Sequence, residues 1–435
     1  MVRDKQRIIK MYIVVTAILL VAEAGIIRFV MIPCLGLSVS IVYYFSDALF
    51  LIGFLLLMLY MLVWCINNKI HKGLKYAFLH ARTKSKIRKS LKNAGYYIEQ
   101  NFRGEKVAVL PKIKLNFSKD FQMGTIAIEN HIKLDKKLDV VDISSALGKY
   151  IVTQQYISDD ANSYVYEFED ASIDRQLVFH SYQELVTYTH EVGDYKLFMD
   201  SKNIVPISSL LLVGSTGSGK SYSAYSLILT MLNWKVKPEI MFADPKNSSL
   251  VVLGNHIAPE NTAGTIEDII VLLERFHDQM QERKLEIQDK LNEKLDADYR
   301  YWSMPANVFI FDEFSSFQSV INTMDKKTRD KVAMLLRNIV LQGRQLGFFL
   351  WILMQKSDAT DLPTSIRDNL IWKVVLGNAT ATTYMTTFEK SADLPIRKFR
   401  CGQGLYSYQG LTRQPQITSF PTLNFDILES VRSCK

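Results

Sequence analysis

The pattern of hydrophobic and polar positions divides this chain into three regions. Two almost unbroken apolar runs come first, at 11–32 and 41–66, and each is about as long as a helix that crosses a bilayer. Shorter β-like stretches follow between 93 and 200, with one helical pattern at Asp142–Gln154. From about residue 201, apolar strands alternate with longer helices, which predicts a mostly parallel sheet covered by helices.

Five apolar runs are the expected strands of that sheet. A long segment rich in Glu, Lys, Arg and Gln, at about Thr265–Lys294, has the composition of a helix with a solvated face. We predict strands at Leu210–Val213, Glu239–Ala243, Val308–Phe311, Phe348–Met354 and Trp372–Leu376.

The two apolar runs predict a transmembrane hairpin over 1–68. The segment 69–92 after it holds nine Lys and Arg residues, whereas the connecting turn holds none. Both ends of the hairpin are therefore expected in the cytoplasm by the positive-inside rule. One alternative is a signal peptide, but the first run lacks a small-x-small cleavage site and a second run follows it. The other is two buried helices of a soluble domain.

Charged residues within and after the hairpin allow more than one interpretation. Glu23, Arg28 and Asp47 interrupt the apolar runs. They either lie near the membrane interfaces or pair between helices or subunits. The basic segment 69–92 could contact nucleic acid or anionic lipid, although membrane topology alone explains its charge.

Composition narrows the class of protein. With 435 residues, 48% of them hydrophobic, the chain can form two or more domains with sizeable cores. Its four cysteines and seven histidines are scattered, which indicates neither a disulfide framework nor a metal site. The cysteines are interpreted as free thiols in a reducing compartment. The net charge of +8 is modest.

One motif carries specific chemistry. The segment GSTGSGKS matches G-x-x-x-x-G-K-[ST] and lies between an apolar strand and a helix. Backbone N–H groups and the helix N-terminus would then face a phosphate chain, which a plain Gly/Ser turn would not explain. Lys220 would reach the β- and γ-phosphates of ATP, and the Ser221 hydroxyl would bind Mg²⁺. The expected binding residues are Gly214, Ser215, Thr216, Gly217, Ser218, Gly219, Lys220 and Ser221.

The apolar run 307–311 ends in an acidic pair, Asp312 and Glu313. At the carboxyl end of a buried strand, Asp312 can hold the Mg²⁺ that Ser221 also contacts. Glu313, one residue later, can act as the general base that activates the attacking water. The alternative is a strand-end pair that faces solvent.

Polar residues follow two other strands. Gln355 ends the strand at 348–354 and is a candidate sensor that orients water or the γ-phosphate, with a simple strand cap as the alternative. Asp244 and Lys246 follow the strand at 239–243. They would lie at the carboxyl edge of the sheet, where open α/β sheets bind ligands. A plain turn is the alternative for this pair.

Arginines matter because a ring-shaped ATPase uses one from a neighbouring subunit to stabilise γ-phosphate charge. Arg344, just before the sensor strand, is the first candidate, and Arg367, just after it, is the second. Arg397 and Arg400 are further arginines near the end of the domain. For each, an ordinary surface or interface ion pair is the alternative.

The order of these segments resembles the FtsK/SpoIIIE family of DNA-pumping ATPases. Typical of it are Asp-Pro-Lys after the second strand, Gly-Arg-x-x-Gly before a strand that ends in Gln, and Gly-x-Gly-Leu-Tyr. The resemblance covers about 200–410 and implies a hexameric ring that uses ATP and Mg²⁺ to move DNA. The segments are GSTGSGKS, FADPKNSSL, NVFIFDEF, LQGRQLGFFLWILMQK, SIRDNLIWKVVLGN and CGQGLY.

Departures from that family refine the expectation. Chromosome-segregating members resemble each other in having four N-terminal spans, a long linker and a C-terminal winged helix. Two spans, a compact domain and one ATPase domain look more like the FtsK-type coupling proteins of Gram-positive conjugative elements. That resemblance implies relaxase or relaxosome proteins and mating-channel proteins as partners. The sensor strand ends in Met354-Gln355-Lys356 instead of the usual Thr-Gln-Arg, which leaves the role of Gln355 intact.

The predicted protein is a membrane-anchored, ATP-driven DNA translocase that acts as a coupling protein in conjugative DNA transfer. Its fold class is α/β, a RecA-like P-loop NTPase with a mostly parallel sheet and helices on both faces. The alternatives are an FtsK-like ATPase of a specialised protein-secretion system and a nucleotide-binding scaffold without hydrolysis. The predicted organisation is a transmembrane hairpin with a cytoplasmic N-terminus (1–68), a basic juxtamembrane segment (69–92), a small α+β domain (93–200), an FtsK-like ATPase domain (201–420) and a C-terminal tail (421–435).

Overall fold

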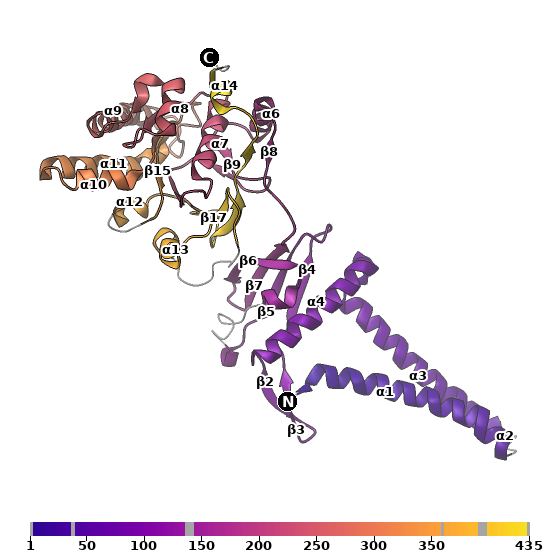
Figure 1. The fold of residues 1–435 in the computed structure, drawn as a ribbon. Coiled ribbons are helices and arrows are strands. Elements are labelled where there is room, and N and C mark those ends of the chain that lie inside the picture. Colours follow the sequence, from indigo (N-terminus) through magenta and orange to yellow (C-terminus); the bar gives the residue numbers. More distant parts are fainter. Residues whose placement is uncertain (1–2, 36–39, 135–142, 358–360, 390–397, 433–435) are drawn as a thin grey trace. The chain divides into compact units, whose positions relative to one another are not determined.

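The computed structural model describes the chain except for residues 1–2, 36–39, 135–142, 358–360, 390–397 and 433–435. The chain divides into two compact units, and the boundary along the sequence falls between Ile173 and Asp174 (Figure 1). The predicted boundary at residue 200 is therefore displaced. Residues 174–200 belong to the second unit because Leu197 and Phe198 are buried in the same core as its central strand.

The first unit begins with a hairpin of apolar helices, each long and apolar enough to cross a membrane. Arg28 forms an ion pair with Asp47 across the hairpin, so these two charges do pair between helices. Nearby, the Ser46 hydroxyl donates to the Ala24 carbonyl at 2.9 Å. Glu23 lies on the exposed side of its helix. The elements are α1 (Lys5–Ile26), η1 (Ile27–Met31), α2 (Ile32–Leu35) and α3 (Ser40–Asn67).

A small α+β part completes the first unit. Its antiparallel sheet has the order β4-β5-β7-β6, and α4 packs on it through Tyr76, Ile87 and Leu91. A second sheet has the order β1-β3-β2. The elements are β1 (Arg3–Asp4), η2 (Ile70–Lys72), α4 (Leu74–Asn93), β2 (Ile98–Phe102), β3 (Glu105–Val109), β4 (Ile113–Phe117), β5 (Met123–Glu129), η3 (Ile132–Leu134), α5 (Ser144–Leu147), β6 (Tyr150–Ile157) and β7 (Ser163–Asp170).

The predicted helix at 142–154 is wrong. Asp142 lies outside the described residues, and the helix α5 ends at Leu147, before Gly148 with φ +72°. The next residues form β6, which pairs antiparallel with β7. The β-branched and aromatic side chains of Tyr150–Thr153 favour a strand, and pairing with β7 outweighs the local helical pattern.

An eight-stranded sheet forms the centre of the second unit, in the order β13-β12-β14-β15-β11-β16-β17-β18. The first six of these strands are parallel, and β17 and β18 continue the sheet antiparallel. All five predicted strands are present, and the predicted α/β fold class is confirmed. The strands are β11 (Leu210–Gly214), β12 (Glu239–Ala243), β13 (Thr262–Ala263), β14 (Asn307–Phe311), β15 (Phe348–Met354), β16 (Trp372–Leu376), β17 (Gln403–Tyr408) and β18 (Gln416–Ser419).

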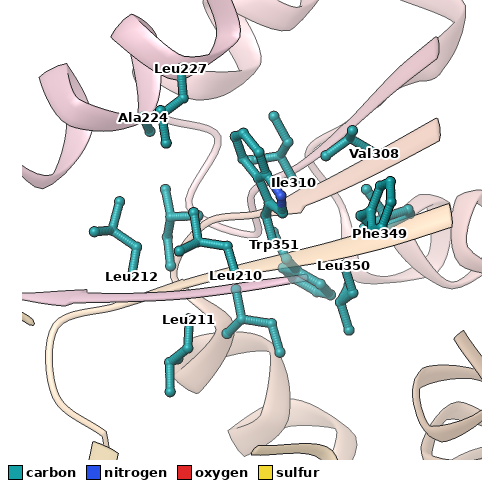
Figure 2. Close-up of a cluster of buried hydrophobic side chains, with 14 of the residues drawn as sticks. Leu210, Leu211, Leu212, Ala224, Leu227, Val308, Ile310, Phe349, Leu350 and Trp351 are labelled. Atoms are coloured by element: carbon teal, nitrogen blue, oxygen red, sulfur yellow. The ribbon is translucent and has the colours of Figure 1, made fainter. Parts of the chain in front are cut away.

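The central strands are buried on both faces. Every residue of β11, β14 and β15 is buried, so side chains that alternate between the faces all meet protein. Figure 2 shows this at β11, where Leu212 lies on the side of Ala224 and Leu227 and Leu211 lies on the opposite side. The residues that follow these strands are therefore attached to a well-packed core.

Helices and short strands cover this sheet. The segment predicted as a tail contributes to the unit through Arg432, because β19 pairs with β8 and Leu423 and Val431 are buried. The remaining elements are β8 (Val178–Phe179), α6 (Tyr182–Val192), β9 (Lys196–Phe198), β10 (Ile204–Pro206), α7 (Lys220–Leu232), α8 (Ser249–Ile257), η5 (Pro259–Asn261), α9 (Ile266–Lys290), α10 (Phe314–Ile321), α11 (Lys326–Leu346), α12 (Thr364–Arg367), α13 (Ala381–Phe388), β19 (Thr422–Leu423) and α14 (Ile427–Arg432).

Candidate functional site

The glycine-rich loop joins the end of β11 to the start of α7. Gly219 caps α7 with φ +95°, a conformation that favours glycine. A Cβ on Gly219 would lie 2.6 Å from the backbone nitrogen of Gly402, and one on Gly214 would lie 2.4 Å from the Ser218 hydroxyl. Gly219 is therefore needed for a loop that curls around the N-terminus of α7, where anions bind, and a side chain at Gly214 would require Ser218 to change its rotamer.

Lys220 lies in the first turn of α7 and is mostly buried. Its ammonium donates to the Asp312 carboxylate at 2.6 Å and lies 3.7 Å from Glu313. These partners come from the end of β14, 92 residues along the chain from Lys220. The fold thus brings the lysine of the loop and the acidic pair into direct contact.

The acidic pair follows β14, two strands away from β11 in the sheet. The Asp312 N–H donates to the carbonyl of Ala243 at the end of β12, which fixes the backbone at this point. Glu313 then adopts φ +50° as the N-cap of α10. That left-handed conformation costs free energy for a residue with a side chain, and such strain occurs often at functional sites.

The Glu313 carboxylate accepts hydrogen bonds from two other predicted site residues. Lys246 donates at 2.9 Å and the Gln355 amide donates at 3.1 Å. Burial alone would raise the pKa of Glu313, but these donors and the charge of Lys220 together hold the pKa below its ordinary value. Glu313 is therefore ionised at neutral pH, as a general base must be.

Burial raises the pKa of Asp312, although the neighbouring Lys220 favours its charged form. A bound divalent cation would favour the charged form further. Asp312 and the half-exposed Ser221 offer one carboxylate and one hydroxyl, which suits Mg²⁺ completed by phosphates and water. Within the described part of the chain, no group of three or more His, Cys, Asp or Glu residues is arranged to hold a metal ion. A Mg²⁺ ion here would therefore need the phosphates of the nucleotide as further ligands.

Asp244 is fully buried, and its carboxylate organises the turn after β12. One oxygen accepts from the Lys246 N–H at 2.9 Å, and the other accepts from the Ser248 N–H at 2.8 Å and from the Ser248 hydroxyl. Asp244 thus positions Lys246, whose half-exposed ammonium reaches Glu313. The Asp-Pro-Lys segment connects β12 to the acidic pair in this way.

The two candidate arginines have different surroundings in their own chain. Arg344 is exposed near the end of α11. Gly347, which follows this helix, accepts a hydrogen bond from the N–H of Asn307, the first residue of β14. Arg344 therefore lies near the start of β14. Asp312 follows the opposite end of β14, roughly 17 Å away along the strand. Arg344 therefore lies too far from the glycine-rich loop of its own subunit to contact it. Arg367 is 8% exposed. Its charge helps to lower the pKa of Glu389, and the Glu389 carboxylate also accepts a hydrogen bond from Lys373, near the start of β16.

The turn before β17 is a contact that the sequence interpretation missed. The Gly402 N–H donates to the Ser218 carbonyl at 2.8 Å, and a Cβ on Gly219 would meet the Cys401 sulfur at 3.1 Å. The glycines of the Gly402-Gln403-Gly404-Leu405-Tyr406 segment were the signal available in the sequence. Arg400 precedes this turn and lies 3.8 Å from Asp174, and Arg397 lies outside the described residues.

Comparisons with known proteins agree with the motifs. No family model matches the chain. The FtsK domain-containing protein YdcQ of Bacillus subtilis (strain 168) is 29% identical over 195 residues, which are 45% of this chain. The match covers only 39% of that relative's length. It confirms the resemblance to FtsK-type proteins that the motifs predict.

Two solved structures are also similar. The monomer form of the pCW3 conjugation coupling protein TcpA with ATPγS has a TM-score of 0.49 and 15% identity, and covers 81% of this chain and 99% of that chain. The cytoplasmic domain of the Thermomonospora curvata type VII secretion ATPase EccC has a TM-score of 0.42 and 17% identity, and covers 55% and 30%. At these TM-scores, neither structure decides between DNA transfer and protein secretion.

Proposed function

We propose that this chain is a membrane-anchored ATPase that moves DNA as a coupling protein in conjugative transfer. The observation that carries the ATPase part is the constellation of Lys220, Asp312, Glu313 and Gln355 at one edge of the sheet. These residues come from three different strand ends, and their contacts match the roles that phosphoryl transfer requires.

ATP hydrolysis follows from this geometry. Lys220 would leave the carboxylates of Asp312 and Glu313 to bind the β- and γ-phosphates. Ser221 and Asp312 would hold Mg²⁺, which neutralises phosphate charge when bound. Glu313, ionised and fixed by Lys246 and Gln355, would accept the proton of the attacking water.

A ring of subunits, proposed to be a hexamer, completes the site. Arg344 is exposed at the amino edge of the sheet, away from the site of its own subunit, so a neighbouring subunit is the place where its charge can meet a γ-phosphate. Arg367 is the second candidate, although it is mostly buried within its own chain. One arginine acting in trans would link hydrolysis to contact between subunits.

The two apolar helices would anchor this ring to the cell membrane, with both termini cytoplasmic. The cargo assignment to DNA rests on the segment order shared with FtsK-type ATPases and on the similarity to YdcQ. Relaxase or relaxosome proteins and mating-channel proteins are the partners that such a role implies.

The test is ATP hydrolysis by the purified full chain at low salt, with and without double-stranded and single-stranded DNA. We expect DNA to stimulate hydrolysis and the stimulation to decline steeply with added salt, because DNA affinity is mainly electrostatic. Lys220→Ala serves as the inactive control. Stimulation by a secreted protein substrate, with no effect of either DNA, would replace this function with protein secretion. A parent protein that binds ATP but never hydrolyses it would indicate a scaffold.

A further inference from the structure

The helix α4 is strongly basic and has one buried side. Its 20 residues include seven Lys or Arg and no Asp or Glu. Tyr76, Ile87 and Leu91 are buried in the core of the small domain. The basic side chains therefore gather on the remaining surface of the helix, and the exposed ones are Lys75, Arg82, Lys86 and Lys89.

This helix contacts the same end of both apolar helices. Near its start, the Phe78 ring lies 5.6 Å from the Trp64 ring of α3. Ten residues later, or roughly 15 Å along the helix, Arg88 binds Asp4, the N-cap of α1. Because α4 connects the end of α3 to the start of α1, it crosses the base of the hairpin. If the hairpin spans a bilayer, α4 lies at the level of the lipid headgroups.

The exposed side of α4 has the composition of an interfacial helix. Leu74, Phe78, Arg82 and Lys86 recur every four residues and so share one stripe, and Lys89 follows three residues later. Leu74 and Phe78 are 64% and 63% exposed, so both present apolar surface outside the core of the unit. An apolar patch beside the span followed by cations is the pattern that suits acyl chains and anionic headgroups.

Cations also crowd the surface between α4 and the hairpin. Burial lowers the pKa of the Lys84 ammonium, and the charges of Arg88, Lys10 and Lys69 lower it further. Arg88 is paired with Asp4, and Lys69 donates to the side chain of Asn116, which carries no charge. Lys10, Lys69, Lys84 and Arg88 thus carry four positive charges, and Asp4 is the acidic residue paired with one of them. A bound anion would stabilise this cluster of cations.

We propose that α4 is a membrane-surface helix that binds anionic phospholipid headgroups of the bilayer crossed by α1 and α3. The proposal rests on the membrane anchor of the proposed function and on no feature of the nucleotide site. Phosphodiester groups would lie along Arg82, Lys86 and Lys89, and Leu74 and Phe78 would enter the acyl boundary. Nucleic acid is the less favoured partner because the exposed Leu74 and Phe78 would gain nothing from a phosphate backbone.

Trp64 allows a direct measurement of this binding. It is the only tryptophan before Trp234, and it lies against α4. The full chain in detergent micelles is titrated with dansyl-labelled phosphatidylglycerol, and energy transfer from Trp64 reports occupancy. Competition with unlabelled phosphatidylglycerol, phosphatidylcholine, inorganic phosphate and double-stranded DNA identifies the ligand. We expect only phosphatidylglycerol to compete well. We expect Trp64→Phe to reduce the signal to the level that the four tryptophans of the second unit produce.

The test variant is Arg82→Gln/Lys86→Gln/Lys89→Gln, whose changes are all on exposed positions. Its affinity for phosphatidylglycerol should fall roughly 100-fold, because each cation near an anionic surface contributes a factor of about five. The matched control, Lys106→Gln/Lys112→Gln/Lys114→Gln, removes equal charge from exposed positions on β3, before β4 and on β4 of the same unit, and should stay within about threefold of the parent.

Four outcomes would overturn the proposal, of which the first three concern the variants and DNA. The first is a test variant that binds phosphatidylglycerol as tightly as the parent, and the second is a control variant that loses as much affinity as the test variant. The third is displacement of the lipid by DNA at low salt, together with a loss of DNA affinity in the test variant as large as its loss of lipid affinity. Competition by inorganic phosphate as strong as by phosphatidylglycerol would show a free-anion site instead of a lipid site. The measurement uses no ATP, so its result is independent of whether DNA stimulates hydrolysis.

Discussion

Replacing Glu313 with Gln separates the two roles that the acidic pair plays. The substitution keeps the shape of the side chain and its hydrogen bond to Gln355 but removes the charge that would accept a proton from water. A general base typically contributes a factor of 10² to 10⁴. We therefore expect kcat to fall by about 100-fold or more, which corresponds to roughly 3–5 kcal/mol of barrier.

The same substitution should not weaken ATP binding and could strengthen it. Glu313 lies 3.7 Å from Lys220, and the side chains are only 15% and 10% exposed. At an effective dielectric constant near 20, this pair attracts by about 4 kcal/mol, and ATP must replace that attraction when it takes the lysine. Asp312, whose carboxylate lies 2.6 Å from the Lys220 ammonium, is unchanged by the substitution and should still hold the lysine. We therefore expect the Kd for ATP to stay equal to that of the parent or to decrease.

The assay combines steady-state phosphate release with titration of a fluorescent ATP analogue. Glu282→Gln, an exposed position on α9, is the matched control and should behave like the parent. The reasoning would be refuted by a Glu313→Gln protein that hydrolyses ATP within about threefold of the parent rate, since a general base contributes far more. It would also be refuted by loss of both ATP binding and folding, because Glu313 would then be a structural residue.

Three further predictions concern other parts of the chain. If Arg344 acts in trans, mixing inactive Lys220→Ala with inactive Arg344→Ala subunits restores hydrolysis, because each supplies what the other lacks. Gly343→Ala should destabilise the protein by about 1–3 kcal/mol in thermal unfolding, because its Cβ would lie 2.1 Å from the Phe348 carbonyl oxygen. Burial, with the charges of Lys84 and Lys69, lowers the pKa of His80 from 6.5 to about 4. Folding therefore favours the neutral form of His80. Its contribution to the free energy of unfolding is complete above pH 6.5, the pKa of the unfolded chain, and declines as the pH falls toward 4. At about pH 5 the loss should be at most about 2 kcal/mol.

Controls for these three predictions come from the same chain. For the arginine, Arg344→Lys in the mixture should restore less hydrolysis than an intact Arg344, and a mixture no more active than its parts would contradict action in trans. For the glycine, an unchanged or higher Tm would show that α11 can move away from β15 without cost. For the histidine, His80→Gln should lose less stability than the parent on acidification, and equal losses would remove His80 as the cause.

The sequence alone was enough to propose the residues of the candidate nucleotide site and to locate five of the eight strands of the sheet. The loop from Gly214 to Ser221, the acidic pair and the five strands each depend on residues that are close in the chain, so a local pattern identified them. The sequence misassigned 142–154 because a helical pattern there competes with pairing to β7, a contact between distant residues. The boundary near residue 174 was missed for the same reason, since β8 pairs with β19 at the end of the chain.

Tertiary structure decided which of those residues meet. Only the order of strands in the sheet brings Lys220 to Asp312 and Glu313, and only the turn after β12 brings Lys246 to Glu313. It also placed Arg344 at the opposite edge of the sheet. Residue types and spacing specify what a side chain can do, because chemistry belongs to the residue. The partner it acts on is set by crossover connections and packing, which join segments far apart in the chain.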